Sequence, residues 1–239
     1  MSTRKLNKLR VATVVALFGV FSVLLYQFGL LVMVLWLNVK TPSSSAFMDA
    51  ARTRLHATDP DAQIAFNWVP YDQISVNLKR AVIASEDANF VTHKGIEWDA
   101  IRQAWEYNRR QSNKGTPRRR GGSTITQQLA KNLFLSESRS YLRKGQELIL
   151  TYMIELVMSK QRILELYLNV AQWGKYTFGA QSAAQKYYDV SASRLSAAQA
   201  ARLAAMLPNP AYYETNRNTR YLRSRANTIQ HRMRLVSVP

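Results

Sequence analysis

The chain has 239 residues, with 33 lysines and arginines against 15 aspartates and glutamates, so its formal net charge is +18. This excess predicts an anionic partner: nucleic acid, anionic lipid or a phosphorylated substrate. The chain contains no cysteine, which excludes disulfides and thiolate metal sites, and its length allows a membrane anchor plus one domain.

An apolar stretch follows a basic start. Residues 1–10 carry four basic side chains and no acid, and residues 11–37 then run without a charge. As a helix, that stretch would span about 40 Å, which exceeds the roughly 30 Å of bilayer hydrocarbon. Because the apolar core of a signal peptide is shorter, we expect a retained transmembrane helix at 11–37 rather than a cleaved leader or a buried core helix. The positive-inside rule places residues 1–10 in the cytoplasm as a basic tail and the rest of the chain outside.

The remainder divides into a connecting segment and one domain. Thr41-Pro42-Ser43-Ser44-Ser45 is typical of a linker, so residues 38–67 are expected to form a linker and a membrane-proximal segment. Residues 68–239 show helical periodicity and no convincing β alternation, which predicts a mainly α domain. Helices are expected at residues 72–85, 95–108, 143–157, 159–167, 180–188, 196–207 and 219–236, and another after residue 124.

A pair of carboxylates ends the first of these helices. Glu86 and Asp87 follow an apolar run, and Phe90, His93 and Gly95 come close behind. A carboxylate placed beside apolar surface in a basic chain suits a general acid or base. The alternative is a solvated helix end with Gly95 as a turn.

Two further segments suit anion binding. Residues 109–120 are rich in charge, glycine and proline, which predicts a mobile basic loop; the alternative is a merely solvated loop. After it, a glycine pair leads into a helix that Ser123 or Thr124 can cap, and such a turn exposes free backbone N–H groups to an anion. Gln127 and Lys131 share one face of that helix, and an ordinary capped helix with a polar face is the alternative.

The motifs together resemble the monofunctional biosynthetic peptidoglycan glycosyltransferases, or transglycosylases, which are related to the glycosyltransferase domain of class A penicillin-binding proteins. The resemblance runs from about Trp68 to about Val236, and the Gly-Gly-Ser-Thr-Ile-Thr-Gln-Gln run is its most specific part. The chain departs from the family pattern at Ala180-Gln181, at Tyr188-Asp189 and in its longer basic loop. The matching motifs, in family order, are Glu86-Asp87-x-x-Phe90-x-x-His93-x-Gly95, Gly121 to Asn132, Arg143-Lys144-x-x-Glu147, and Lys160-x-x-Ile163-Leu164-Glu165-Leu166-Tyr167-Leu168-Asn169.

The resemblance implies a mainly α, lysozyme-like glycosyltransferase domain behind a single transmembrane helix in the bacterial cytoplasmic (inner) membrane, with the catalytic domain periplasmic or extracytoplasmic. The implied reaction polymerises lipid II into β-1,4-linked glycan strands, with inversion and release of undecaprenyl pyrophosphate. The implied partners are lipid II, the growing glycan strand, anionic membrane lipid and cell-wall synthesis or division proteins, but no nucleic acid.

The family's residue roles carry over by motif position. Glu86 takes the position of the general base, and Glu147 that of the second catalytic carboxylate, near the donor pyrophosphate and its divalent cation, Mg²⁺ or Mn²⁺. Asp87, Phe90, His93 and Gly95 take supporting positions. The substrate-binding positions are Ser123, Thr124, Gln127, Gln128, Lys131, Asn132, Arg139, Arg143 and Lys144.

Two other functions stay open at this point. A lysozyme-like lytic enzyme would use Glu86 as a general acid on existing glycan. A membrane-tethered nucleic-acid or lipid-binding module would need only the basic charge. The basic residues near Glu147 argue against the lytic enzyme, because cleavage of a neutral glycan releases no pyrophosphate. The binding module has no use for two carboxylates.

Overall fold

The computed structural model describes residues 3–115, 121–138 and 140–239, with side chains from residue 10 onward. Arg139 and the arginines at 118–120 of the predicted basic loop therefore lie outside the described residues. The chain forms two compact units, Met1–Lys40 and Thr41–Pro239.

The first unit is one helix, α1 (Thr3–Val39). Within it, Arg10–Val39 is long and apolar enough to cross a membrane. The apolar side chains between Val11 and Phe28 are exposed, as contact with lipid requires. The helix is compatible with a membrane anchor, and the sidedness of the chain stays a prediction.

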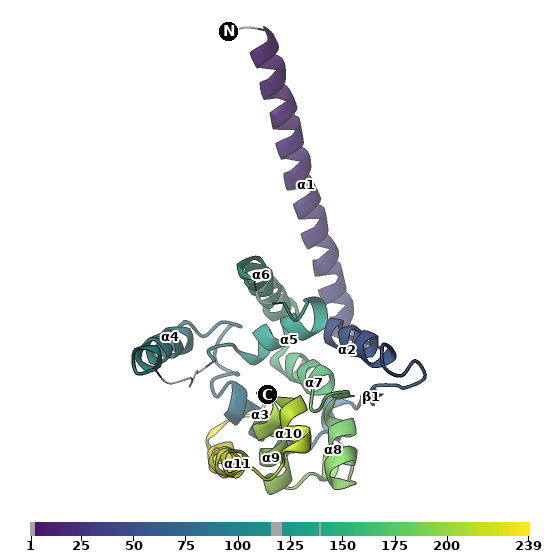
Figure 1. The fold of residues 1–239 in the computed structure, drawn as a ribbon, viewed down its shortest axis with the longest axis vertical. Helices are drawn as coiled ribbons and strands as arrows, with labels where there is room; N and C mark the ends of the chain where they lie inside the picture. Colours follow the sequence, from purple (N-terminus) through teal and green to yellow (C-terminus); the bar gives the residue numbers. More distant parts are fainter. Residues whose placement is uncertain (1–2, 116–120, 139) are drawn as a thin grey trace. The chain divides into compact units, whose positions relative to one another are not determined.

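The second unit is helical, as the periodicity predicts (Figure 1). Two strands, β1 (Ala65–Phe66) and β2 (Thr177–Phe178), pair in parallel, with Ala65 opposite Thr177. Short 3-10 turns occur at η1 (Tyr71–Gln73), η2 (Ala192–Arg194) and η3 (Met233–Leu235). The α-helices are α2 (Ala46–His56), α3 (Val76–Glu86), α4 (Trp98–Asn113), α5 (Ile125–Phe134), α6 (Tyr141–Val157), α7 (Lys160–Val170), α8 (Ala180–Tyr188), α9 (Ala197–Met206), α10 (Pro210–Thr215) and α11 (Arg220–Arg232).

Several boundaries differ from the sequence prediction, and caps explain two of them. Helix α3 begins late because the Ser75 side chain accepts a hydrogen bond from the Asn77 N–H, so the expected start at residue 72 was wrong. Helix α2 was not predicted, although Ser45 caps it by accepting from the Met48 N–H. Helix α4 continues to Asn113, so residues 109–113 of the predicted loop are helical.

Two groups of helices form the interior of this unit. Helix α5 packs on α6 and α7, and α3 packs on α9 and α11. Helix α7 is buried on nearly every face, which explains the run of apolar residues from Ile163 to Val170. The two groups meet at the C-terminal end of α3, where Glu86 contacts Gln128 of α5.

The fourth motif anchors the extended segment before α3. The buried Asn169 side chain donates to the Val69 carbonyl at 2.9 Å and accepts from the Val69 N–H at 3.0 Å. One turn earlier on α7, Glu165 accepts from the Tyr71 N–H at 3.0 Å. These bonds satisfy backbone groups that a strand would otherwise pair, so this motif positions the chain leading to Glu86.

Candidate active site

Glu86 ends α3 and is held by donors from three helices. Its side chain is 12% exposed. One oxygen, Oε1, accepts from the Ser85 hydroxyl at 2.9 Å, and Oε2 accepts from the Gln128 amide at 3.0 Å. Arg225 of α11 places Nη2 3.6 Å from Oε1 and donates to the Ser85 hydroxyl at 3.1 Å. The carboxylate is therefore fixed in direction but still reaches solvent.

A buried tyrosine orients the amide that faces Glu86. The Tyr167 hydroxyl donates to Gln128 Oε1 at 3.0 Å, which leaves the amide nitrogen pointing at Glu86. Burial raises the pKa of Tyr167 well above its usual value, and the negative charges of Glu86 and Asp87 raise it further. Tyr167 therefore stays protonated and remains a donor.

Asp87 is a structural carboxylate rather than a second base. Its side chain is 1% exposed. It accepts from His93 Nε2 at 2.8 Å and from the Ile125 N–H, at the first turn of α5, at 2.9 Å. His93 Nδ1 accepts from the Gly95 N–H at 3.0 Å, so the ring proton lies on Nε2, facing Asp87. Asp87 thus joins the end of α3 to the start of α5.

The glycine of the first motif allows the second motif to pack against it. Gly95 has φ +86°, and a Cβ there would lie 2.7 Å from Glu155 Cγ. The Thr124 hydroxyl donates to the Gly95 carbonyl at 2.5 Å. Thr124 also caps α5 in a capping box with Gln127, which decides between the two predicted caps.

Glu147 lies in a cationic environment on the buried face of α6. Its side chain is 4% exposed. Arg143 donates to Oε2 at 2.8 Å, and the Lys144 ammonium pairs with Oε1. Lys144 also lies 3.4 Å from the hydroxyl of Ser123, just before α5. The i,i+4 ion pair between Arg143 and Glu147 is therefore largely buried, because the two side chains are 16% and 4% exposed.

Lys131 links the surroundings of the two glutamates. It lies on α5 three positions after Gln128, so both side chains occupy neighbouring places on one face. Burial lowers its pKa, and the charges of Arg143 and Lys144 lower it further, whereas Glu147 and Glu86 act in the opposite direction. The pKa of Lys131 thus depends on the charges of both Glu86 and Glu147, so both glutamates lie near helix α5.

The side chains around Glu147 do not form a protein metal site as they stand. Both of its oxygens already accept from cations, and Mg²⁺ prefers several oxygen ligands in an octahedron. Among the described residues, Asp87, His93 and Glu97 bring donor atoms within 4.8 Å of one another. There, however, both His93 nitrogens are engaged, and Glu97 accepts from Asn89 at 2.6 Å.

Several of the other predicted site residues are buried. Phe90 is fully buried, with the Lys160 ammonium 4.7 Å from its ring centroid. Gln127 and Asn132 are buried, and the Gln127 carbonyl completes the cap of α5. Three of the predicted substrate-binding residues, Thr124, Gln127 and Asn132, are therefore buried in this structure.

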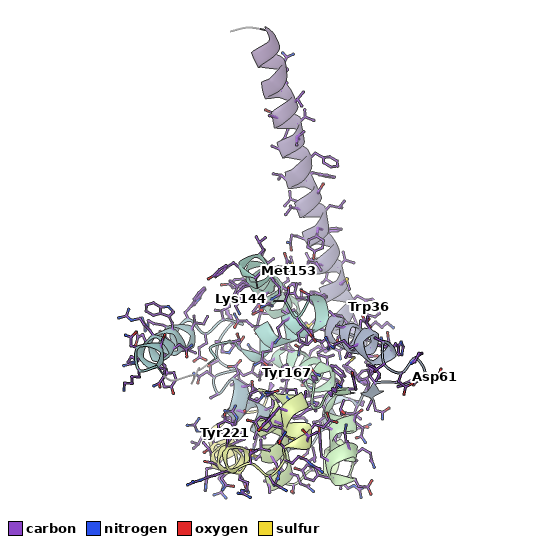
Figure 2. All side chains as sticks on the ribbon, in the orientation of Figure 1. Trp36, Asp61, Lys144, Met153, Tyr167 and Tyr221 are labelled. Atoms are coloured by element: carbon purple, nitrogen blue, oxygen red, sulfur yellow. The ribbon has the colours of Figure 1, made fainter. Side chains whose placement is uncertain are left out.

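Sequence reasoning missed three residues that contact Glu86 directly or through Gln128. Ser85 directly precedes Glu86 in the chain. Tyr167 lies inside the fourth motif, but the sequence prediction assigned it no role. Arg225 gives no signal in the sequence, because it lies 139 positions from Glu86 (225 − 86) in a helix with other arginines. Figure 2 shows Tyr167 well inside the helical unit. Along the chain it lies far from Glu86, which it contacts only through Gln128.

Comparisons with known proteins show the family to which the chain belongs. A family model described as Transglycosylase matches residues 53–234. A biosynthetic peptidoglycan transglycosylase of Bordetella pertussis is 60% identical over 238 residues, covering 100% of this chain and 98% of the relative. Proteins of the same description from Laribacter hongkongensis and Methylobacillus flagellatus are 51% and 52% identical, covering 96% and 93% of this chain and 96% of each relative. The chain therefore belongs to the transglycosylase family, and it is a peptidoglycan glycosyltransferase.

Proposed function

We propose that this glycosyltransferase polymerises lipid II into β-1,4-linked glycan strands, with inversion at the donor C1 and release of undecaprenyl pyrophosphate. The observation that carries the proposal is that Glu86 contacts Gln128 of α5, while Lys144, which pairs with Glu147, contacts Ser123 just before the same helix. A carboxylate with neutral donors therefore lies near a cationic cluster. That combination suits attack by a neutral hydroxyl on a donor that leaves as pyrophosphate.

Glu86 acts as the general base. It takes the proton of the acceptor 4-hydroxyl while that oxygen forms the new bond to the donor C1, on the face opposite the leaving group. The bonding electrons of the departing C–O bond pass to the pyrophosphate. Ser85 and the Gln128–Tyr167 pair hold the carboxylate in one direction, which lowers the entropy cost of reaching this geometry.

The cationic cluster of Lys131, Arg143 and Lys144 stabilises the leaving group. Arg143 and Lys144 pair with one carboxylate, Glu147, and Lys131 adds a further positive charge that Glu147 influences. Glu147 fixes two of these cations through ion pairs, so they are preorganised before charge develops on the pyrophosphate. A lytic enzyme acting on neutral glycan has no need of this cluster.

The divalent cation stays a prediction, with Glu147 as its proposed ligand. Arg143 or Lys144 would have to release a carboxylate oxygen for Mg²⁺ or Mn²⁺ to bind there. Such an ion would supply a further positive charge beside the pyrophosphate. Activity in the presence of a chelator, with and without added Mg²⁺, tests this directly.

The exposed apolar surface supports a lipid-linked substrate. Helix α6 buries Glu147 on one face and exposes Leu142, Ile149, Tyr152 and Leu156 on the opposite face. Helix α4 exposes Trp98 and Trp105. Aromatic and aliphatic side chains of this kind favour the membrane interface, so we propose that both helices contact the outer leaflet of the inner membrane. Cell-wall synthesis or division proteins remain proposed partners.

Product analysis tests the proposal. The full chain in detergent, incubated with labelled lipid II, should yield long glycan strands and free undecaprenyl pyrophosphate. The same protein should not shorten preformed glycan. Shortening of preformed glycan without growth from lipid II would instead favour the lytic alternative and would refute the proposed reaction.

A further inference from the structure

A groove lined by arginines lies between α8, α9 and α11. It consists of two adjoining hollows of about 230 and 380 Å³ that share Tyr188 and Arg202. Arg217 and Tyr187 line the smaller hollow, and Arg223 and Gln230 line the larger one. In Figure 1 these helices gather at the lower end of the helical unit, whereas α6 lies at its upper end.

The groove carries positive charge that the described residues do not neutralise. Arg202 donates to the Arg217 carbonyl at 2.5 Å and to Asn218 Oδ1 at 2.8 Å. Among the described residues, none of Arg202, Arg217 and Arg223 has a carboxylate within 4.0 Å. Residues 197–239 contain seven arginines and one acid, Glu214, which pairs with Lys186. Arg217 and Arg223 are exposed to solvent, so their charge is available to an anionic ligand.

The groove is separate from the active site although one helix serves both. Leu222, Arg225 and Ile229 recur along one face of α11, where the leucine and isoleucine are buried and the arginine reaches Glu86. Arg223 and Gln230 lie on the neighbouring face and line the groove. Figure 2 labels Tyr221 near the start of this helix. Changes at Arg223 therefore leave the contacts of Glu86 in place.

We propose that this groove binds the carboxylates of the peptides that a peptidoglycan strand carries. The inference rests on the proposed function, in which such a strand is the product. Guanidinium groups match a carboxylate with two parallel hydrogen bonds, and tyrosine rings and side-chain amides suit a sugar or peptide beside it. Hollows of a few hundred Å³ match a short ligand better than the surface of a folded protein. A strand repeats its peptides, so weak contacts would add up along it.

Binding of a soluble fragment tests the groove without requiring catalysis. The probe is a fluorescent disaccharide–peptide fragment from digested peptidoglycan, and a matched probe has its carboxylates converted to amides. Each is titrated into the full chain in detergent, as wild type, as Arg217→Gln with Arg223→Gln, and as Arg220→Gln. Arg220 is exposed on the same helix but does not line the groove, so it controls for net charge.

The double variant should bind the carboxylate probe at least about tenfold more weakly than wild type, because charge-assisted hydrogen bonds are lost. Arg220→Gln should bind within about twofold of wild type, because an isolated exposed charge contributes little. Wild type should bind the amidated probe as weakly as the double variant binds the charged one. Equal affinities of wild type and double variant, at unchanged melting temperature, would overturn the proposal.

Two further results distinguish this proposal from a site for acidic protein segments and from the proposed function. Tighter binding of a plain hexaglutamate peptide than of the fragment would overturn the proposal in favour of an acidic protein segment.

Polymerisation of lipid II by wild type, measured separately, tests the proposed function. If polymerisation occurs but the double variant binds the fragment normally, only the groove assignment fails. If the affinities differ as expected but lipid II is not used, the carboxylate site stands and the proposed reaction fails.

Discussion

Glu86 begins one family motif and Glu147 ends another, yet the side chains that surround the two glutamates differ in kind. Glu86 is 12% exposed and accepts from two neutral groups, a serine hydroxyl and a glutamine amide, with Arg225 at 3.6 Å. Glu147 is 4% exposed and is held by two cations, Arg143 and Lys144. We therefore propose that the first receives a proton and that the second organises positive charge.

This difference in neighbours is the basis on which we propose different roles for the two glutamates. Two neutral donors orient Glu86, with Arg225 farther away, whereas two ion pairs hold Glu147. Lys131 lies between these two environments and responds to both. The predictions below change one environment at a time.

The largest expected effect is that of Glu86→Gln. The amide keeps the size and most hydrogen bonds of the carboxylate but cannot take a proton. Loss of a general base should lower the initial rate of lipid II polymerisation by about 10²- to 10⁴-fold. The melting temperature should stay close to that of wild type. A variant that keeps more than about a tenth of the rate would remove Glu86 from the role of base.

Glu147→Gln should reduce both turnover and stability. The change leaves Arg143 and Lys144 without their shared carboxylate, and Lys144 is 40% exposed, so solvent screens part of the cost. We expect a loss of at least about 1 kcal/mol, which corresponds to a melting temperature lower by roughly 2–4 °C. The control is Glu137→Gln, whose surface pair with Arg54 contributes little. Equal melting curves for the two variants would contradict the buried cluster.

Tyr167→Phe tests whether the orientation of Gln128 matters. The ring still fills its place, but Gln128 loses the donor that fixes its amide. The expected result is a kcat about tenfold lower with little change in KM, since substrate contacts are retained. Tyr71→Phe is the matched control, because that hydroxyl donates to the Pro239 carbonyl and not toward Glu86. If the two variants turn over alike, Tyr167 is only a packing residue.

The smallest expected effect concerns pH. Burial lowers the pKa of Lys131, so this ammonium loses its proton at a lower pH than an ordinary lysine. Because the protonated form serves the pyrophosphate, kcat/KM should fall as pH rises through that lowered pKa. Arginine stays charged, so Lys131→Arg should move this alkaline limb to higher pH. An unmoved limb would show that another group controls it.

The parts of the molecule that local patterns control were predictable from sequence. Thr124 and Ser196 cap their helices, and the apolar stretch at 11–37 lies within a single helix. Helix α2 escaped prediction because its polar and apolar residues mix without a strong pattern. The two-residue strands are too short to leave an alternation that sequence can show.

The candidate site was likewise predictable from the sequence only in part. Motif order indicates that Glu86, Gln128, Lys131 and Glu147 belong together, but it does not reveal which neighbours are charged. The family resemblance assigns Gln127 to the substrate-binding cleft, yet its side-chain carbonyl is used in the cap of α5. Arg225 reaches Glu86 through packing of α11 on α3, which is a long-range contact that no local pattern encodes.

The most direct test of the central claim is to measure binding of labelled lipid II by Glu86→Gln and by Lys131→Gln at equilibrium. If Glu86 is the base and Lys131 belongs to the pyrophosphate site, the first variant should keep the wild-type Kd while losing turnover. The second should bind at least about tenfold more weakly, because it loses a charge-assisted contact to phosphate. The opposite pattern, with weakened binding by Glu86→Gln and unchanged binding by Lys131→Gln, would contradict the division of roles between the two environments.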